Sequence, residues 1–370
     1  MTRPDGSMRD RVEAVMRGQE NPGAWGAPLW VVEKIYGSGV KARNALYDLH
    51  ILKPAQAPCK IISVGNLTVG GTGKTPFVLL MAEKLIATAP DDWSFGIVSR
   101  GYGGKAKQGV HVVCDGAALG DGPPVSADEP YMLAKKLGTI PVVCAPRRIE
   151  GAVELVKRFG VDAVIIDDGF QHRAISRNLN ILLVDALNPF GNGHLFPRGV
   201  LREHVSGIKR ADLVVITGAD GLDGEERGEL AHRITRLARR DVDIIAVDGR
   251  ITGFEDMDAN PSPPPDAPVY AFCAIANPAY FKNELEKKNI KLAGFKAFGD
   301  HHWFSDEDIE RIRADATGCE ASAIVTTQKD AVRLIDRYKR LGFALKVAVW
   351  KMEITEGGEK LDSAISEIIG

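Results

Sequence analysis

Several features that would assign a chain to a specialised class are missing from this sequence. Its five cysteines (Cys59, Cys114, Cys144, Cys273 and Cys319) are scattered and form no CxxC pair. This excludes the usual zinc and redox motifs and favours a reducing compartment. No apolar run reaches 18 residues, so we expect no transmembrane helix. The first residues lack the charged start and apolar core of a signal peptide, so we expect a chain that is not exported.

The sequence also lacks an excess of charge of either sign. It has 47 Lys and Arg residues against 49 Asp and Glu residues, and its formal net charge is -2. Basic residues are not banded with aromatic ones, so we expect no nucleic-acid partner. No GxGxxG motif follows the first predicted strand, which disfavours a Rossmann dehydrogenase. At 370 residues and 45% hydrophobic composition, the chain resembles an ordinary globular protein with room for two domains.

What the sequence does contain is a regular alternation of two patterns. Short β-branched runs lie at 60–64, 95–99, 110–114, 140–144, 163–167, 180–185 and 212–217. Stretches of helical length and periodicity lie at 76–88, 127–138, 147–160 and 223–239. This alternation predicts an α/β fold with a mostly parallel sheet flanked by helices.

A proline-rich segment at 260–268 interrupts the alternation, which then resumes at 269. Fixed φ angles and few core-forming residues predict an exposed, semi-rigid connection there. We therefore predict four parts: an N-terminal amphipathic segment (1–50), a larger domain (51–250), a linker (251–268) and a smaller C-terminal α/β domain (269–370). A final run at 344–354 is predicted to be a strand, and the sequence leaves its pairing open.

The strongest local signal is a glycine-rich turn between an apolar strand and a helix, Val64-Gly-Asn-Leu-Thr-Val-Gly-Gly-Thr-Gly-Lys-Thr-Pro76. Phosphate needs several backbone N–H groups at a helix N-terminus, which small residues allow. Gly70, Gly71 and Gly73 supply that freedom, so this turn predicts a P-loop. In such a loop Lys74 reaches the terminal phosphates and the Thr75 hydroxyl coordinates Mg²⁺.

The loop departs from the common P-loop spacing at one position. In the pattern Gly-x4-Gly-Lys-Thr the first glycine falls on Thr68. A glycine-rich turn without a ligand is the alternative interpretation, but the strand before and the helix after favour phosphate binding.

Two aspartates follow an apolar strand in Ala163-Val-Ile-Ile-Asp-Asp168, as in the metal-holding element of P-loop enzymes. Gln171 and His172 lie on the same loop, which shares a sheet edge with the P-loop. An Asp-Asp-Gly turn is also ordinary chemistry for leaving a strand. Helix capping alone would also explain Asp128 and Glu129, and an ordinary polar loop would explain His301-His302. Spacing alone therefore does not decide whether either pair is functional.

Seven segments together resemble the tetraacyldisaccharide 4'-kinase family, in the family's order over residues 25 to 355. The family shares threonine at position 68. The matching segments are Val64 to Pro76, Ser99-Arg-Gly-Tyr-Gly-Gly104, Asp128-Glu-Pro130, Asp167-Asp-Gly-Phe-Gln-His172, Arg198-Gly-Val-Leu-Arg-Glu203, Asp300-His-His302 and Thr326-Thr-Gln-Lys-Asp330.

The resemblance implies a P-loop NTPase-like kinase of lipid A biosynthesis. It implies ATP as donor, Mg²⁺ as cofactor and the 4'-hydroxyl of a tetraacyldisaccharide 1-phosphate as acceptor. This glycolipid would be met at the cytoplasmic face of the inner membrane, with the protein peripheral (monotopic) at the membrane surface and with no obligate protein partner.

The resemblance also implies roles for individual residues. It implies that the catalytic residues are Asp128, His301 and Lys74, and the sequence does not decide between His301 and His302. It implies that the metal is bound by Thr75, Asp167 and Asp168, and the substrate by Arg100, Arg202 and Glu203. The implied nucleotide-binding residues are Thr68, Val69, Gly70, Gly71, Thr72, Gly73, Lys74, Thr75, Gln171 and His172.

Residues 25–43 combine aromatic and aliphatic residues with Lys34, Lys41 and Arg43. An amphipathic helix of this kind suits a membrane interface. The same face could instead pack on its own domain, and Gly37-Ser-Gly39 is expected to weaken or break one long helix. Two other functions stay open at this point: a P-loop kinase or ATPase acting on a soluble small molecule, and a nucleotide switch without catalysis that binds a partner.

Overall fold

The structure, a computed structural model, describes residues 12, 14–16, 18, 20–21, 23–102, 104–105, 109–334 and 337–370. Most of the first 22 residues of the predicted N-terminal segment, residue 103 of the segment 99–104 and residues 335–336 of the predicted C-terminal domain lie outside these residues.

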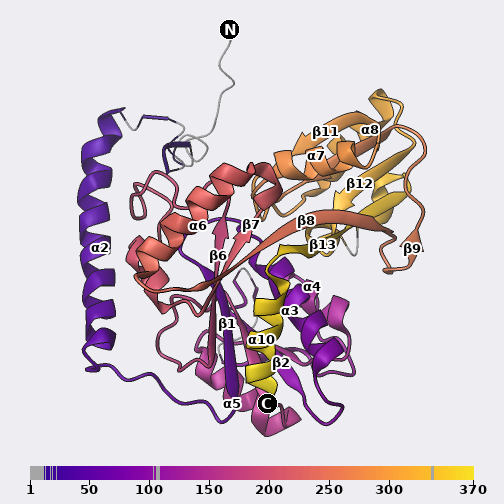
Figure 1. The fold of residues 1–370 in the computed structure, drawn as a ribbon. Coiled ribbons are helices and arrows are strands. Elements are labelled where there is room, and N and C mark those ends of the chain that lie inside the picture. Colours follow the sequence, from indigo (N-terminus) through magenta and orange to yellow (C-terminus); the bar gives the residue numbers. More distant parts are fainter. Residues whose placement is uncertain are drawn as a thin grey trace.

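One sheet of 13 strands runs through the described part of the chain (Figure 1). Its order is β11-β10-β12-β13-β8-β7-β6-β1-β5-β2-β4-β3, with β9 paired to β8. Most neighbours are parallel, but β3–β4, β8–β9 and β8–β13 are antiparallel. The strands are β1 Lys60–Asn66, β2 Phe95–Ser99, β3 His111–Cys114, β4 Val142–Cys144, β5 Ala163–Asp167, β6 Leu179–Asp185, β7 Leu213–Thr217, β8 Asp243–Glu255, β9 Pro261–Ser262, β10 Val269–Cys273, β11 Leu292–Ala297, β12 Ala323–Thr327 and β13 Leu345–Glu356.

Helices cover both faces of the sheet, as the alternating pattern predicts. The predicted α/β fold with a mostly parallel sheet is confirmed. The helices are α2 Gly26–Asp48, α3 Lys74–Thr88, α4 Asp128–Leu137, α5 Arg148–Phe159, α6 Gly224–Ala238, α7 Pro278–Lys287, α8 Asp306–Gly318, α9 Gln328–Ala331 and α10 Gly358–Ile369, and the 3-10 helices are η1 Gly23–Trp25, η2 Val205–Arg210, η3 Ala219–Gly221 and η4 Tyr338–Leu341.

The strand β1 shows why this pattern makes three layers. Successive side chains of a strand point to opposite faces. Ile62 and Val64 pack with Phe77 of α3 in one core, whereas Ile61 packs with Leu155 of α5 in the other. Because both faces are covered, the parallel strands are apolar throughout.

The sheet has two halves, which we call the first half (β1 to β7 with their helices, and α10) and the second half (β10 to β12 with α7 to α9). The long antiparallel pair of β8 and β13, the β8–β13 ribbon, joins them (Figure 1). Its register runs from Val347 opposite Glu255 to Glu356 opposite Ala246. The final predicted strand therefore pairs before the proline-rich segment, not within it.

The end of the chain differs from the sequence-based boundaries. The helix α10 was not among the predicted elements, and Leu361 and Ile365 on it pack in the same core as Phe77. The chain thus crosses to the second half by β8 and returns by β13. Residues 357–370 consequently pack on the first half, although the sequence grouped them with the smaller C-terminal domain.

The helix α2 is continuous, and the expected interruption at Gly37-Ser-Gly39 does not occur. A β-carbon added at Gly37 would lie 2.7 Å from Leu195 Cδ1. Gly37 therefore lets the 190–201 loop approach the helix, which offsets its low helix propensity.

Candidate functional site

The glycine-rich turn forms the N-terminus of α3, directly after β1. Gly73 has φ of +77° and precedes the first helical residue, Lys74, so its left-handed conformation suits glycine. Thr75 is buried in the first turn. Thr68 is also buried and pairs with Leu201 in an isolated bridge. The threonine at this position is thus held by the neighbouring loop, and the turn keeps the strand-loop-helix geometry of a phosphate site.

Lys74 is directed toward the second predicted aspartate. Its Nζ lies 3.6 Å from Asp168 Oδ1 and donates to Asn66 Oδ1 at 3.3 Å. Asp168 also accepts two hydrogen bonds from Arg202 Nη1, both 2.8 Å long. Burial opposes ionisation of Asp168, but the charges of Lys74 and Arg202 outweigh it and lower its pKa.

Asp167 has the environment expected of a metal ligand. It ends β5 and is 2% exposed, and its Oδ1 has no hydrogen-bond partner among the described residues. Burial, and then the nearby carboxylates of Glu129 and Asp168, raise its pKa. A divalent cation would supply the missing partner and charge, so Asp167, with Thr75, fits Mg²⁺. Within the described chain, no cluster of three or more Asp, Glu, His or Cys residues could hold a metal alone.

Asp168 occupies a backbone conformation that non-glycine residues rarely adopt. Its φ is +53°. Such strain persists only where the surroundings hold it, here through Arg202 and Lys74, and it concentrates at functional sites.

Arg148 joins this group although sequence reasoning missed it. It is 3% exposed at the start of α5, and its Nη1 donates to the carbonyls of Ala145 and Pro146. Burial lowers its pKa, which the charges of Asp167 and Asp168 partly restore. No spacing signal marks it, because Arg147-Arg148 looks like an ordinary basic pair before a helix.

The four other predicted residues of this region have different environments. Gln171 donates to the Asn66 carbonyl at 2.7 Å and to Glu203 at 3.1 Å. Glu203 is 1% exposed and also accepts from Arg210 at 2.7 Å. Both side chains therefore hold together the loops beside the P-loop. Any effect of Glu203 on the substrate would be indirect, through the position of its own loop.

His172 and Arg100 lie nearer the surface. Burial, followed by the charges of Arg148, Arg177 and other arginines, lowers the pKa of His172 to about 4, so its imidazole is neutral at pH 7. Arg100 is exposed just after β2. It is one of the charges acting on His172, so the loops after β2 and β5 share one electropositive edge.

Asp128 and His301, which are 173 residues apart in sequence, meet between the two halves. Asp128 starts α4 and His301 follows β11, and His301 Nδ1 lies 3.3 Å from Asp128 Oδ2. His301 has φ of +61°, a second strained site residue. Burial would raise the pKa of Asp128, but its hydrogen bond from His301 and the charge of Arg333 hold that pKa well below the ordinary range. The carboxylate is therefore ionised at neutral pH.

Both ring nitrogens of His301 lie near cations. Lys329 Nζ lies 3.1 Å from His301 Nε2, 3.0 Å from Glu129 Oε1 and 3.4 Å from Asp300 Oδ1. Arg333 Nη2 lies 3.3 Å from His301 Nδ1, so the ring is held between Lys329 and the Asp128–Arg333 pair. The geometry favours this Asp-His arrangement for moving a proton.

His302 faces away from Asp128. Its Nε2 lies 2.8 Å from Asp308 Oδ2, within the capping box of α8, and its ring stacks on Phe298 with centroids 5.0 Å apart. Of the two adjacent histidines, His301 is therefore the one in contact with the Asp128 carboxylate.

The second half and the β8–β13 ribbon lie directly against the phosphate loop. A β-carbon added at Gly71 would lie 2.7 Å from Ala276 Cβ, and one at Gly73 would clash with Met352 Cε. Ala276 follows β10 and Met352 is on β13. The phosphate loop therefore faces the interface between the two halves, where Asp128 and His301 also meet. We call this interface the seam.

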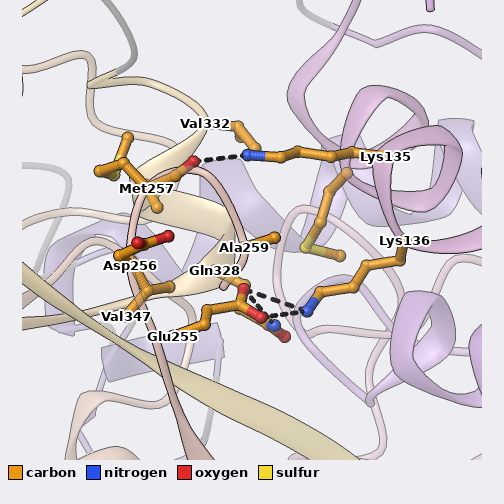
Figure 2. A pocket seen from close by; sticks show the side chains of 11 residues that line it. Lys135, Lys136, Glu255, Asp256, Met257, Ala259, Gln328, Val332 and Val347 are labelled. Carbon is orange, nitrogen blue, oxygen red and sulfur yellow. Dashed lines mark hydrogen bonds and ion pairs between the residues drawn. The ribbon is translucent and has the colours of Figure 1, made fainter. Parts of the chain in front are cut away.

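A small cavity of about 30 Å³ lies farther along this seam, where α4 meets the ribbon. Figure 2 shows Lys136 and Gln328 converging on Glu255, with bonds of 2.8 Å and 2.9 Å, and Lys135 reaching the Met257 carbonyl. This volume admits one or two waters but no nucleotide or sugar. It is therefore a joint between the halves, not a ligand site.

The class of site follows from three features: a strand-loop-helix phosphate site, a buried aspartate with one oxygen unpaired among the described residues, and an Asp-His pair between the two halves. Together they define a P-loop phosphotransferase site. The comparisons with known proteins agree. Residues 25–370 match the LpxK family model, tetraacyldisaccharide-1-P 4'-kinase. The chain therefore belongs to this family, and the predicted resemblance is confirmed.

Individual relatives span nearly the whole chain. A tetraacyldisaccharide 4'-kinase of Anaeromyxobacter sp. (strain K) is 37% identical, covering 94% of this chain and 93% of the relative. One of Desulfatibacillum aliphaticivorans is 36% identical, covering 93% and 94%. A crystal structure of LpxK from Aquifex aeolicus in complex with ATP has a TM-score of 0.73 and 29% identity, covering 93% of this chain and 99% of that one.

The helices of the described residues include none that combines the length and the apolar character needed to cross a membrane.

Proposed function

We propose that this chain transfers the γ-phosphoryl group of ATP to the 4'-hydroxyl of tetraacyldisaccharide 1-phosphate in lipid A biosynthesis. Family membership supports the reaction, and the residues of the site support its mechanism. The observation that carries the proposal is the position of Asp128: an ionised carboxylate at the seam that the phosphate loop also faces. Glu129, beside it, is close enough to Asp167 to act on its pKa.

The reaction divides into parts that named residues perform. When Mg²⁺ is bound, it neutralises charge on the nucleotide phosphates, and Asp167 and Thr75 would hold it. Lys74 and the backbone N–H groups at the start of α3 hold the phosphates. Asp128 accepts the proton that the sugar hydroxyl loses as it attacks phosphorus, and His301 orients that carboxylate.

The helix α2 supports an acceptor that carries acyl chains. Trp30, Val31 and Ile35 on it are 49%, 48% and 70% exposed, and Figure 1 shows the helix standing at the side of the first half. Its inward contacts include hydrogen bonds: the Tyr36 hydroxyl donates to the Arg202 carbonyl and Asn44 donates to Glu203.

These contacts connect the apolar face to the site. Arg202 also binds Asp168, so α2 is attached to the loop that borders the phosphate region. A helix lying in the membrane interface would keep the acyl chains in lipid while the headgroup reaches the seam. We therefore propose that the protein is peripheral, and that α2 binds the membrane surface at the cytoplasmic face of the inner membrane.

Product formation tests the reaction. Purified protein, Mg-ATP and tetraacyldisaccharide 1-phosphate in detergent micelles should give a lipid heavier by one phosphoryl group, detected by mass spectrometry, and ADP release should depend on the lipid. Lipid-independent ADP release without that product would return the acceptor to a soluble molecule, and nucleotide binding without turnover would favour a switch.

Vesicle sedimentation tests the membrane surface. Ile35→Glu should lower the fraction bound to anionic phospholipid vesicles about tenfold or more, because burial of such a side chain is worth about 1.5–3 kcal/mol. Ser363→Glu on α10 makes the same charge change at an exposed position of the first half and should bind as the unaltered protein does. Equal binding of both variants would rule out α2 as the membrane contact.

A further inference from the structure

Arg333 is the buried arginine that binds Asp128 across the seam. It follows α9 in the second half, whereas Asp128 belongs to the first half. We propose that Arg333 is a positioning residue for phosphoryl transfer: it holds one oxygen of the Asp128 carboxylate so that the other oxygen receives the acceptor proton. This inference rests on the proposed function, in which Asp128 is the base.

The contacts divide unequally between the two carboxylate oxygens. Arg333 Nε donates to Asp128 Oδ2 at 2.9 Å, Arg333 Nη2 binds the same oxygen, and His301 Nδ1 lies 3.3 Å from it. Among the described residues, Oδ1 accepts only from the Glu129 amide, at 3.0 Å. A carboxylate oxygen has two lone pairs, so Oδ1 retains one for a proton.

Arg333 is itself held rigidly. It is 3% exposed, and its Nη1 donates to Asp330 Oδ1 at 3.0 Å and to the Ala274 carbonyl at 3.3 Å. Asp330 is fully buried and accepts from Thr327 Oγ1 at 2.7 Å and from the Ala274 amide at 3.0 Å. A planar guanidinium fixed on one side by Asp330 presents a fixed fork to Asp128 on the other, which is how a supporting residue orients a base.

The charge of Arg333 also acts on Asp128. The titratable and charged groups facing Asp128 are His301, Arg333, Lys329 and the neighbouring Glu129. Arg333 favours the ionised carboxylate, whereas burial opposes it. Removing the cation therefore raises the pKa of Asp128, and the acid limb of the pH–rate profile should move to higher pH.

The test compares variants by kcat, by KM for the lipid and by the pH dependence of kcat/KM between pH 4 and 9, a range in which the unaltered protein should show no acid limb from Asp128 because the pKa of that carboxyl is lowered. Arg333→Met should lower kcat about 10- to 100-fold, leave KM nearly unchanged and move the acid limb to higher pH. Arg333→Lys keeps the charge but loses the fork, so it should keep the limb near its original position and recover part of kcat. The matched control is Lys136→Met, which also removes a cation from the seam, at Glu255, without touching Asp128. It should keep the original pH profile.

A second variant covers a failure to fold, because Arg333→Met leaves Asp330 buried without its partner. The double variant Asp330→Asn with Arg333→Met removes that unpaired charge. It should show the same movement of the acid limb.

Two outcomes decide separately. Arg333 variants with the pH profile of Lys136→Met would overturn the proposal and leave Arg333 as a structural contact only. The proposed function fails differently: Asp128→Asn alone would then retain near-normal turnover. If both ideas hold, adding Arg333→Met to Asp128→Asn should slow the reaction little further, because the base it positions is already absent.

Discussion

The phosphate loop and the seam are two parts of one site that are built in different ways. The phosphate loop is made by backbone conformation within one short segment, residues 67–73, between β1 and α3. The seam is made by side chains from α4, α9 and the loop after β11, which meet through ion pairs between residues as far as 205 positions apart. The loop depends on local geometry, whereas the seam depends on the two halves closing on each other.

This difference predicts which substitutions affect one half of the molecule alone and which depend on both halves. A change in the phosphate loop should affect nucleotide phosphates whatever the second half does. A change in the seam should affect the acceptor step and respond to the state of both halves.

The largest effect is expected at the base. Asp128→Asn keeps the shape of the side chain but removes proton acceptance, so turnover should fall about 10²- to 10⁴-fold. Single-turnover transfer from bound ATP measures this step directly. Nucleotide affinity should be unchanged, and near-normal transfer would remove Asp128 from the mechanism.

A somewhat smaller effect is expected in the phosphate loop. Lys74→Ala should lower turnover about 10²- to 10³-fold, because one preorganised cation at the phosphates is lost. Lys84→Ala on the same helix removes a half-buried lysine that pairs with Asp362 and should leave turnover unchanged. Equal turnover in the two variants would contradict the phosphate role of Lys74.

Substitutions of the two adjacent histidines should have different effects on phosphoryl transfer. His301→Gln should slow transfer about 10-fold to 100-fold because the Asp128 carboxylate loses an orienting donor. His302→Gln loses its contact with Asp308 and its stacking on Phe298, both away from Asp128, so transfer should be normal and the free energy of unfolding should fall by about 1 to 2 kcal/mol. Paired kinetic and urea-unfolding measurements would show a reversed order if the functional histidine were His302.

The smallest effect concerns stability against pH. The pKa of folded Asp128 lies below its unfolded value of about 3.9. Its ion pairs therefore stabilise the fold above that pH, and the contribution is lost as pH falls toward the folded pKa. The difference in unfolding free energy between the unaltered protein and Asp128→Asn should shrink below about pH 4 in urea titrations. A difference independent of pH would mean that these ion pairs do not stabilise the closed seam.

The same contrast explains what could be predicted from the sequence. The α/β pattern and the Gly-Lys-Thr turn are local signals, so most strands, most helices and the phosphate loop were predicted close to their observed positions. The strands β8 and β9 were not predicted. Asp128 and His301 were named only through family resemblance, because helix-capping chemistry accounts equally well for an Asp-Glu pair. Arg148 and Arg333 carry no local signal at all, since only the tertiary fold brings them to the aspartates.

Two misjudged elements have physical causes. The glycines of α2 did not break the helix, because Gly37 makes room for Leu195 and packing outweighs propensity. The helix α10 was missed, and it returns to the first half because the β8–β13 ribbon carries the chain back. Strand pairing over about a hundred residues follows from the whole fold, not from a short window of sequence.

The most direct test of a site shared between the two halves is a double-mutant cycle on single-turnover phosphoryl transfer, with Asp128→Asn, His301→Gln and the two combined. If the two side chains act as one unit, the combined variant should be no slower than Asp128→Asn alone, within about threefold. If the two factors multiply instead, Asp128 and His301 act independently, and the shared site across the seam is contradicted.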